Sequence, residues 1–323
     1  MVIKYGAAPK RFESTWDTTQ AGSANDTVVL PLRSNGSYDF RIDWGDGKSN
    51  RDDITTYNQS EVTHQYDDTG VYTIKVVGDI TGWSFNRGGD KNKILNISSW
   101  GPFELTTNEA NNFRECANLS LTTKDRLTLK NNSYIFYNTP NLGSGGDFSD
   151  WDVSQTTNFN YLFDATDSNF NCVGLNNWDV SNVTSMHTAL NSQAFNQPLN
   201  NWDTSSCTNM TSMFGRYRKV MAFDQDLGSW DVSNVTNMHM MFGARRRGAY
   251  CAFNNGGSPS ISGWNTGKVT RMDSMFSSCN LFNQPIGGWD TSSCTNMGAM
   301  FQYCTGFEED LSNWDTSGVT SMN

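Results

Sequence analysis

The sequence predicts a mainly β protein with short helical turns, in which a small β-sandwich precedes a solenoid of repeats about 25 residues long. The first observation is a pattern that recurs from Phe148 onward, F-x-x-x-L-x-x-W-D-x-S-x-V-T-x-M-x-x-M-F, fullest in Phe195–Phe214, Phe223–Phe242 and Phe282–Phe301. A fixed period of this length indicates stacked units that bury one continuous core. The second observation is that residues 11–80 lack this period and show short alternating apolar runs instead.

The first module is expected at residues 1–80. The runs DTVVLPL (26–32), YDFRIDW (38–44) and VYTIKVVG (71–78) predict antiparallel strands of a β-sandwich. The sequences WGDG (44–47), HQY (64–66) and GVYTI (70–74) resemble the PKD family of immunoglobulin-like domains. This resemblance implies a spacer or adhesive module without catalytic activity. Asp43 and Asp46 in its turn are weak calcium candidates, and we favour a turn-stabilising role for them.

Residues 81–147 are predicted to form degenerate first repeats. The sequence ISSW (97–100) resembles the L-x-x-W motif, and Phe113–Leu119 resembles the end of a repeat. Trp100 and Trp151 are 51 residues apart, about two periods, so one atypical repeat is expected in 119–147. Terminal repeats commonly depart from the consensus because they cap the stack.

Residues 148–323 are predicted to hold about seven repeats, the last of them incomplete. The two methionines and the closing phenylalanine of each pattern fall at i, i+3 and i+4, which predicts a short helical turn. The period is marked by tryptophans separated by 27, 24, 28, 34, 25 and 25 residues: Trp151, Trp178, Trp202, Trp230, Trp264, Trp289 and Trp314.

The pattern W-D-x-S-x-V-T-x-M-x-x-M-F resembles the BspA-like leucine-rich repeat family in its DUF285 form. The resemblance implies a leucine-rich-repeat-like solenoid and a role in surface attachment or recognition, and it implies no catalytic residues. Members of this family occur as bacterial surface adhesins, as mycoplasma surface proteins and in reading frames of marine phages. The sequence stops within a repeat at Ser321–Asn323. We therefore expect a shortened chain or a neighbouring subunit that covers the open C-terminal end.

Charge and hydropathy exclude several classes of partner. The 33 acidic and 23 basic residues give a net charge of −10, which argues against binding of nucleic acid or an anionic membrane surface. No apolar run approaches the ~18 residues of a membrane span. The first residues lack the apolar core of a signal peptide, so we expect either that the numbering starts after processing or that the protein does not use the secretory route.

The seven cysteines include no C-x-x-C pair, so neither a zinc site nor a disulfide framework is predicted. Cys207 and Cys294 occupy a position that holds valine in other repeats, which predicts small buried side chains. Cys279 and Cys304 each lie three residues after a closing phenylalanine, so a disulfide between adjacent repeats is geometrically feasible. Mostly free thiols suit folding in a reducing compartment.

An aspartate follows nearly every tryptophan of the repeats. Two interpretations are open: structural caps that accept backbone N–H bonds, or a calcium-binding column. Asn265 replaces the aspartate in one repeat, which keeps the capping oxygen and loses the charge, so we favour caps and expect no cofactor. The residues concerned are Asp152, Asp179, Asp203, Asp231, Asp290 and Asp315.

Catalytic motifs are absent from the sequence, and we predict a protein that is not an enzyme. There is no G-x-S-x-G, G-x-G-x-x-G or H-E-x-x-H motif. His187 and His239 share a repeat position two repeats apart, roughly 10 Å, too far for one metal ion. Paired carboxylates of the glycosidase kind are not singled out, so a carbohydrate-active enzyme is an alternative of low weight.

Two consecutive repeats carry basic insertions after the closing phenylalanine. The distance to the next phenylalanine grows from five or six residues to nine and eleven, and the insertions hold six of the eight Lys and Arg residues after Phe148. One interpretation is solvated, variable loops. The other is a basic ledge for an anionic glycan or an acidic protein surface. The ledge comprises Arg216, Tyr217, Arg218, Lys219, Arg245, Arg246, Arg247 and Tyr250.

These observations predict a non-enzymatic attachment or recognition protein. We expect an exposed phage virion component, such as a tail fibre, that folds in the host cytoplasm. Its expected partners are a host-surface glycan or protein and neighbouring virion subunits. The alternative is a bacterial cell-surface adhesin.

Overall fold

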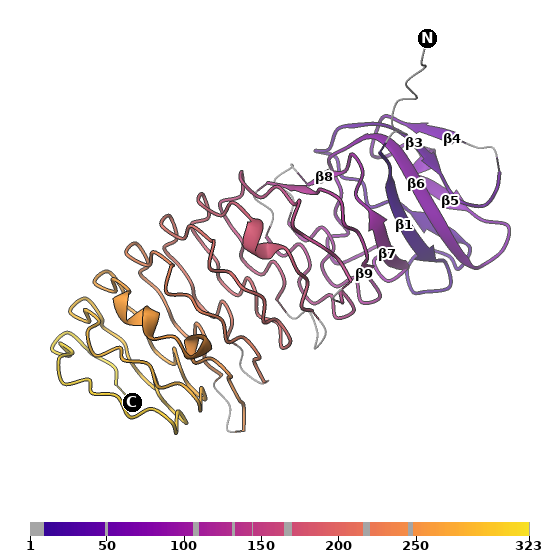
Figure 1. Cartoon of the computed structure of the whole chain (residues 1–323). Coiled ribbons are helices and arrows are strands. Elements are labelled where there is room, and N and C mark those ends of the chain that lie inside the picture. The colour runs from indigo at the N-terminus through magenta and orange to yellow at the C-terminus, as the bar shows by residue number, and fades with distance from the viewer. Residues whose placement is uncertain are drawn as a thin grey trace, which may run out of the picture.

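The computed structural model describes residues 10–48, 51–105, 110–130, 133–143, 145–164, 170–215, 220–244 and 248–322. The molecule is elongated: the strands gather towards the N-terminus, and successive loops stack away from them towards the C-terminus (Figure 1). The strands are β1 (Phe12–Asp17), β2 (Thr27–Val29), β3 (Tyr38–Asp43), β4 (Arg51–Ile54), β5 (Thr63–Gln65), β6 (Val71–Ile80), β7 (Ile94–Ser99), β8 (Glu104–Leu105), β9 (Ser120–Leu121) and β10 (Thr128–Leu129). Short 3-10 helices lie at η1 (Ser60–Val62), η2 (Leu175–Asn177), η3 (Asn255–Gly257) and η4 (Pro259–Gly263).

Six strands form one mixed sheet in the order β4-β3-β6-β1-β7-β9. Every neighbouring pair is antiparallel except β7 and β9, which are parallel. In β3, Tyr38, Phe40 and Ile42 are buried, whereas Asp39 and Arg41 are exposed. This alternation is typical of a sheet that packs one face on a core. Because β7 and β9 lie beyond residue 80, the sheet continues into the segment where degenerate repeats were expected.

The predicted fold class, an immunoglobulin-like sandwich followed by a leucine-rich-repeat-like solenoid, is wrong. The three predicted runs do contain β2, β3 and β6, but β3 and β6 belong to the mixed sheet, and β2 pairs only with β5. After β10 the described residues contain no strand, so no sheet extends along the repeats. The chain is mainly β, with its sheets confined to the N-terminal part.

Single parallel bridges, rather than strand ladders, connect the repeats. Three residues after the bridged residue of six repeats, the backbone takes a left-handed conformation with φ between 50° and 59°. That conformation turns the chain, so an extended strand cannot continue through it. This residue lies between the two methionine positions of the pattern, so the short helical turn predicted over the methionines and the closing phenylalanine does not form. The left-handed residues are Tyr161, Thr188, Ser212, Met240, Ser274 and Ala299.

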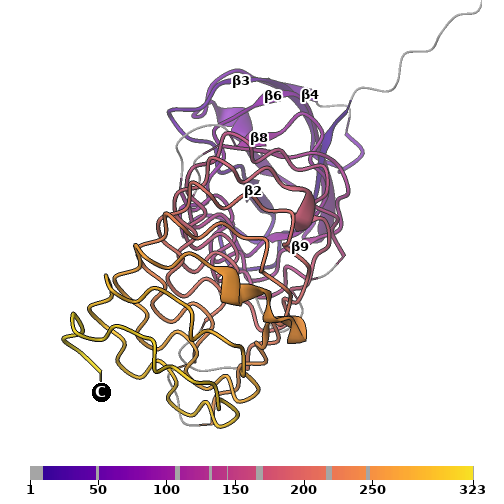
Figure 2. The same cartoon turned by 60° about the vertical axis from the view of Figure 1, so that its left-hand side comes forward.

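Hydrogen bonds still connect the repeats on both sides of that turn. The N–H groups of Met210, Ser212 and Phe214 donate to three carbonyl oxygens of the next repeat at 2.8–2.9 Å. Thr236 donates from both its N–H and its hydroxyl group to the carbonyl of Thr208, at 2.9 and 3.1 Å. Figure 2 shows the resulting stack of similar loops from a second side.

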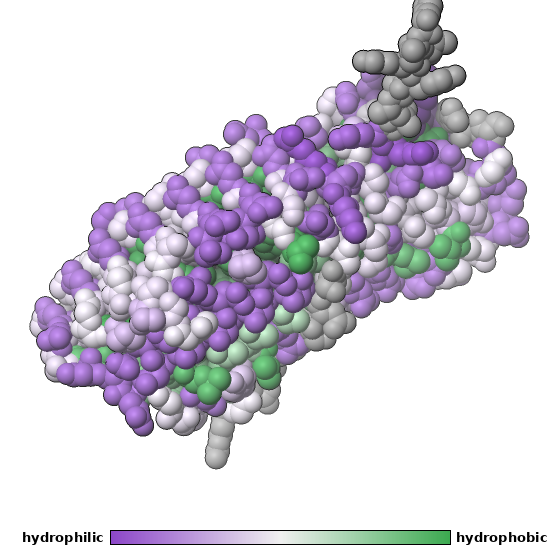
Figure 3. All heavy atoms as spheres, in the orientation of Figure 1, coloured by the Kyte–Doolittle hydropathy of each residue, from purple (hydrophilic) through white to green (hydrophobic). Residues whose placement is uncertain are grey.

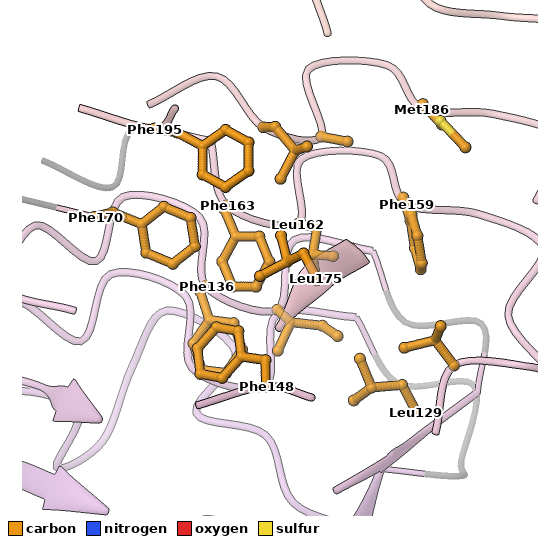
Figure 4. Close-up of a cluster of buried hydrophobic side chains, with 14 of the residues drawn as sticks. Leu129, Phe136, Phe148, Phe159, Leu162, Phe163, Phe170, Leu175, Met186 and Phe195 are labelled. Atoms are coloured by element: carbon orange, nitrogen blue, oxygen red, sulfur yellow. The ribbon is translucent and has the colours of Figure 1, made fainter. Parts of the chain in front are cut away.

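Phenylalanine rings form a column through the core of the repeats. The rings of Phe136 and Phe163 lie 5.6 Å apart between centroids and are nearly parallel, as are those of Phe214 and Phe242 at 5.7 Å. Figure 4 shows Phe136, Phe163 and neighbouring leucines in this buried cluster. The side chains are essentially inaccessible to water, so the column supplies apolar burial at every step of the stack.

The tryptophans form a second column that is bonded to the backbone. The indole N–H of Trp230 donates to the carbonyl oxygen of Leu199 in the preceding repeat at 2.9 Å. The same bond, 2.7–3.1 Å long, is made by Trp178, Trp202, Trp264, Trp289 and Trp314. The buried indole N–H of Trp151, by contrast, has no acceptor.

An aromatic cluster joins the sheet to the repeats. Phe12 of β1 contacts Trp83 at 5.5 Å between ring centroids, and Trp83 contacts Phe103 at the same distance. Phe113 then stacks on Phe136, at 5.5 Å, as the first step of the phenylalanine column. All five side chains are buried, so the sheet covers the N-terminal face of the stack.

We predict that Trp230→Phe destabilises the protein more than Trp151→Phe. Both changes remove a similar volume from a buried column, but only the first removes a hydrogen bond, the one from the indole N–H to the carbonyl of Leu199. That carbonyl keeps the N–H of Trp202 at 3.2 Å, so the expected cost is that of one hydrogen bond, about 0.5–1.5 kcal/mol. Urea unfolding of the two variants measures the difference, and equal losses would show that the indole bond contributes nothing to stability.

We also predict that the stack tolerates loss of a whole period better than loss of a partial one. Deleting the 25 residues Phe282–Gly306 brings Phe307 to the place of Phe282, on which it already stacks at 5.8 Å. Deleting only Phe282–Ser293 places unlike residues in the aromatic columns. Thermal unfolding of both deletions is the measurement. The nearest-neighbour account fails if the two lose the same stability.

Candidate functional site

The candidate site is the edge of the stack where two consecutive repeats are lengthened, at residues 215–222 and 243–252. The segments that follow the two basic insertions lie side by side. Met221 forms a parallel bridge with Cys251, and its N–H donates to the carbonyl oxygen of Tyr250 at 2.8 Å. The two chain segments therefore return to the stack next to each other.

The segments that precede the insertions are adjacent as well. A Cβ atom at Gly215 would lie 2.7 Å from the carbonyl oxygen of Gly243 and 2.0 Å from that of Met240. Only glycine allows the two backbones to approach so closely. The side-chain amide of Asn191 donates to the carbonyl of Gly215 from the other side. Both insertions thus leave from and return to one edge.

Most residues of the predicted basic ledge lie outside the described residues. These are Arg216, Tyr217, Arg218, Lys219, Arg245, Arg246 and Arg247. Tyr250 is described and is half-buried at the end of the second insertion. The structure brings together the two pairs of segments that flank the ledge.

Apolar side chains are exposed beside the insertions. Val220 follows the first insertion and is 52% exposed; Leu281 and Tyr303 follow the closing phenylalanines of the next two repeats and are 56% and 46% exposed. Figure 3 shows that apolar side chains are scattered over an otherwise largely hydrophilic face. Scattered exposed apolar residues are ordinary on protein surfaces, so these three do not by themselves define a contact site.

A disulfide joins Cys251 to Cys279 and fastens the end of the second insertion to the following repeat. The expectation of a chain without a disulfide is wrong for this pair, and the feasible Cys279–Cys304 bond is not the one formed. Cys251 lies nine residues after the closing Phe242, whereas Cys279 lies three residues after Phe276, because the insertion intervenes. Counted back from Phe253 it lies two residues away, close to the three residues that separate Cys279 from Phe282.

The other five cysteines are free thiols. Cys207 and Cys294 are fully buried, which confirms the prediction made from their valine-like position. Burial raises the pKa of Cys207 to about 11, so its thiolate is scarce at neutral pH and the group is chemically inert.

The aspartates that follow the tryptophans all accept a hydrogen bond from the backbone N–H two residues further on, at 2.9–3.1 Å. Asn265 accepts the same bond from Gly267 at 3.3 Å without a charge. Hydrogen bonds from the serine two residues on, through its hydroxyl and N–H groups, hold the pKa of five of the carboxyls below the usual value. These five are Asp152, Asp203, Asp231, Asp290 and Asp315.

The carboxylates of the two weak calcium candidates accept hydrogen bonds within their own turn. Asp43 accepts from the N–H of Gly45 at 3.0 Å, and Asp46 accepts from the N–H of Lys48 at 2.9 Å. The second oxygen of Asp46 lies 3.0 Å from Nε2 of His64, and both side chains are almost nine-tenths buried. Among the residues that the structure describes, no three His, Cys, Asp or Glu side chains are grouped so that they could hold a metal ion.

His187 and His239 make separate contacts. Nε2 of His187 lies 3.2 Å from the hydroxyl oxygen of Tyr161, and burial lowers the pKa of His187. Nδ1 of His239 lies 2.6 Å from a carboxylate oxygen of Asp273. The two histidines share no partner in these contacts.

Sequence reasoning missed a row of stacked aromatic residues outside the core. Tyr134 and Tyr161 stack at 4.3 Å between centroids, and the guanidinium group of Arg114 lies 4.8 and 4.5 Å from the rings of Tyr134 and Tyr137. The signal was an aromatic residue two positions before the closing phenylalanine in two successive repeats. Because neighbouring side chains occupy these ring faces, the row extends the stack and is a weak candidate for binding sugars.

A family model described as "Mycoplasma protein of unknown function, DUF285" matches residues 106–216, 166–247 and 251–323, together more than half of the chain. No curated protein and no solved structure matches the chain. In the part of the chain that the structure describes, no helix has the length and apolar character needed to span a membrane.

We predict that the aspartate caps make stability depend on acid pH. A carboxyl whose pKa is lowered by folding contributes stability above its unfolded pKa of 3.8, and that contribution is lost as the pH falls through the folded pKa. Changing Asp152, Asp203 and Asp231 to Asn copies the Asn265 cap without a titrating group. The triple variant should therefore lose less stability than the wild type between about pH 5 and pH 2.

Urea unfolding at several pH values in this range tests the prediction. The charge-matched control replaces three exposed acids, Asp39, Asp68 and Glu308, by Asn, Asn and Gln. The control should keep the wild-type dependence on pH. A cap variant with an unchanged slope would contradict the assigned role.

Proposed function

The chain belongs to the DUF285 family of mycoplasma proteins of unknown function, and we propose that it is a non-catalytic attachment protein that binds a partner through the edge bearing its insertions. In this proposal the protein is exposed on a phage virion, as a tail fibre or another surface component. Its partner is a host-surface glycan, a host-surface protein or a neighbouring virion subunit.

The observation that carries this proposal is the pairing of Met221 with Tyr250 and Cys251. It supports the idea that the two insertions, which contain six of the eight basic residues after Phe148, act as one surface. The chain as a whole has a net charge of −10, so this concentration of bases is unlike the rest of the sequence. Guanidinium groups bind carboxylate and phosphate groups through paired hydrogen bonds, which favours an anionic partner.

The insertions are not needed for stacking. The repeat that closes at Phe301 reaches Phe307 without an insertion, and its rings stack on Phe276 and Phe282 at 5.9 and 5.8 Å, as elsewhere in the column. The closing and opening phenylalanines are thus in place with or without extra residues between them. This supports a role for the insertions outside folding.

A second setting, the surface of a bacterial cell, is favoured by the disulfide between Cys251 and Cys279. Disulfides persist mainly in oxidising environments, whereas the virion setting was inferred partly from free thiols. Proteomic analysis of purified virions and of surface-labelled cells distinguishes the two settings. Detection only on cells would replace the virion component by an adhesin and leave the binding edge unchanged.

We predict that replacing Arg245, Arg246 and Arg247 by Ser weakens attachment without unfolding the protein. Three positive charges are removed from the proposed surface, so binding should weaken and become less sensitive to salt. The measurement is binding to host cells, or to the partner subunit, across a range of salt concentrations.

The control replaces three exposed lysines elsewhere, Lys124, Lys130 and Lys268, by Ser, with the same change in net charge. The control should bind as the wild type does. Attachment that survives the arginine changes at low salt would show that the insertions are solvated loops and that binding occurs elsewhere.

A further inference from the structure

Three cysteines occupy one column at the edge that bears the insertions. Cys251 and Cys279 form the disulfide, and Cys304 occupies in the next repeat the position that Cys279 occupies in its own. The local turns are the same: the N–H of Cys279 donates to the carbonyl of Phe276, and the N–H of Cys304 donates to that of Phe301, both at 2.9 Å. Cys279 therefore has a cysteine on each side along the stack.

The free thiol of Cys304 lies directly against the central cysteine. Its Sγ donates to the carbonyl oxygen of Cys279 at 2.9 Å. The disulfide itself is shielded, because Cys251 and Cys279 are 1% and 0% exposed, whereas Cys304 is half-buried. An external thiol cannot reach the central sulfur without local opening, but Cys304 already contacts the backbone of Cys279 within the fold.

We propose that Cys304 exchanges into the disulfide, so that Cys279 alternates between two partners. The thiolate of Cys304 attacks Sγ of Cys279, the Cys279–Cys304 bond forms, and the Cys251–Cys279 bond breaks. The electron pair of the broken bond leaves on Cys251, which takes up the proton that Cys304 lost. One disulfide replaces another, so neither an oxidant nor a reductant is consumed.

The column suits this reaction because of its order along the stack. Cys251 belongs to the repeat before Cys279, and Cys304 belongs to the repeat after it, so the attacking and leaving cysteines lie on opposite sides of Cys279 along the stack. Exchange proceeds through attack of a thiolate on one sulfur with departure of the other. A stacked column brings attacking, central and leaving groups into one row.

Burial makes the exchange slow at neutral pH. It raises the pKa of Cys304 to about 12, so only a small fraction of this thiol is ionised. Because the rate follows the thiolate fraction, it should rise about tenfold for each pH unit until the pH nears that value. The disulfide is therefore long-lived at neutral pH and becomes labile in alkali.

Exchange would release the end of the second insertion from a covalent tie. Once Cys251 is free, only noncovalent contacts hold this segment, among them the bond from its N–H to the carbonyl of Ser278 at 3.0 Å. The effect of this release on binding rests on the proposed function. The exchange chemistry does not.

The first experiment tests whether Cys279 and Cys304 can pair. In Cys251→Ser, incubated with oxidised glutathione, we expect a Cys279–Cys304 bond and four free thiols, against five in the wild type. Cys279→Ser is the control and should leave all six of its cysteines free. Six free thiols in Cys251→Ser would show that Cys279 and Cys304 do not pair and would overturn the proposal. Seven free thiols in the wild type would overturn it as well, because no disulfide would then be present to exchange.

The second experiment measures exchange in the wild type, and it holds even where a variant fails to fold. The protein is kept between about pH 7 and pH 10, quenched with N-ethylmaleimide and digested with chymotrypsin, which separates the three cysteines. We expect the Cys279–Cys304 peptide pair to appear about tenfold faster per pH unit, and to be absent in Cys304→Ser. Cys294→Ser, which removes a buried thiol outside the column, should exchange as the wild type does. Absence of the new pair throughout this range would overturn the proposal.

The third experiment separates this inference from the proposed function. Attachment is compared between Cys304→Ser, in which the insertion stays tied, and Cys279→Ser, in which it is untied. If exchange occurs but both variants and the triple arginine variant bind as the wild type does, the proposed function is wrong and the exchange stands. If the arginine variant loses binding but no exchange is found, the function stands and this inference is wrong.

Discussion

In each repeat a non-glycine residue with left-handed backbone, such as Ser212 or Met240, governs how the stack is held together. This conformation costs roughly 1–3 kcal/mol for a non-glycine residue, so it persists only where its surroundings enforce it. It ends the extended segment after a single bridged pair. The backbone groups of neighbouring repeats must then be satisfied one by one rather than by a strand ladder.

Side-chain hydrogen bonds replace part of the backbone pairing that a sheet would provide between repeats. The indole of Trp230, the hydroxyl of Thr236 and the amide oxygen of Asn254 each bond to the backbone of a neighbouring repeat, at 2.9, 3.1 and 3.0 Å. Each bond requires a particular residue type at a particular position. This explains why the repeated pattern is so specific in its polar residues as well as its apolar ones.

The same arrangement leaves the connections after the closing phenylalanine free to vary. The residues between the closing phenylalanine of one repeat and the first phenylalanine of the next do not belong to the aromatic columns. Residues can therefore be added there without disturbing the packing. Two consecutive repeats contain such additional residues. Gly215 and Met221 hold the two ends of the first insertion against the ends of the second. The disulfide at Cys251 restricts the second insertion further. A variable edge on a regular stack is a suitable place for recognition.

The sequence by itself determined the features that depend on residues close together in the chain or on the repeat period. Burial of Cys207 followed from its valine-like position, and the family followed from the repeated pattern. The bond from Ser205 N–H to Asp203 spans only two residues, so local chemistry suffices to anticipate it.

Only the tertiary structure decided features that depend on distant partners. The extension of the sheet to β7 and β9 depends on pairing with β1, which no local pattern encodes. Whether a repeat forms a strand depended on a left-handed residue whose conformation is imposed by its neighbours. The choice of Cys251 as the partner of Cys279 depended on how an insertion returns to the stack, because two sulfurs bond only where the folded backbone brings them together.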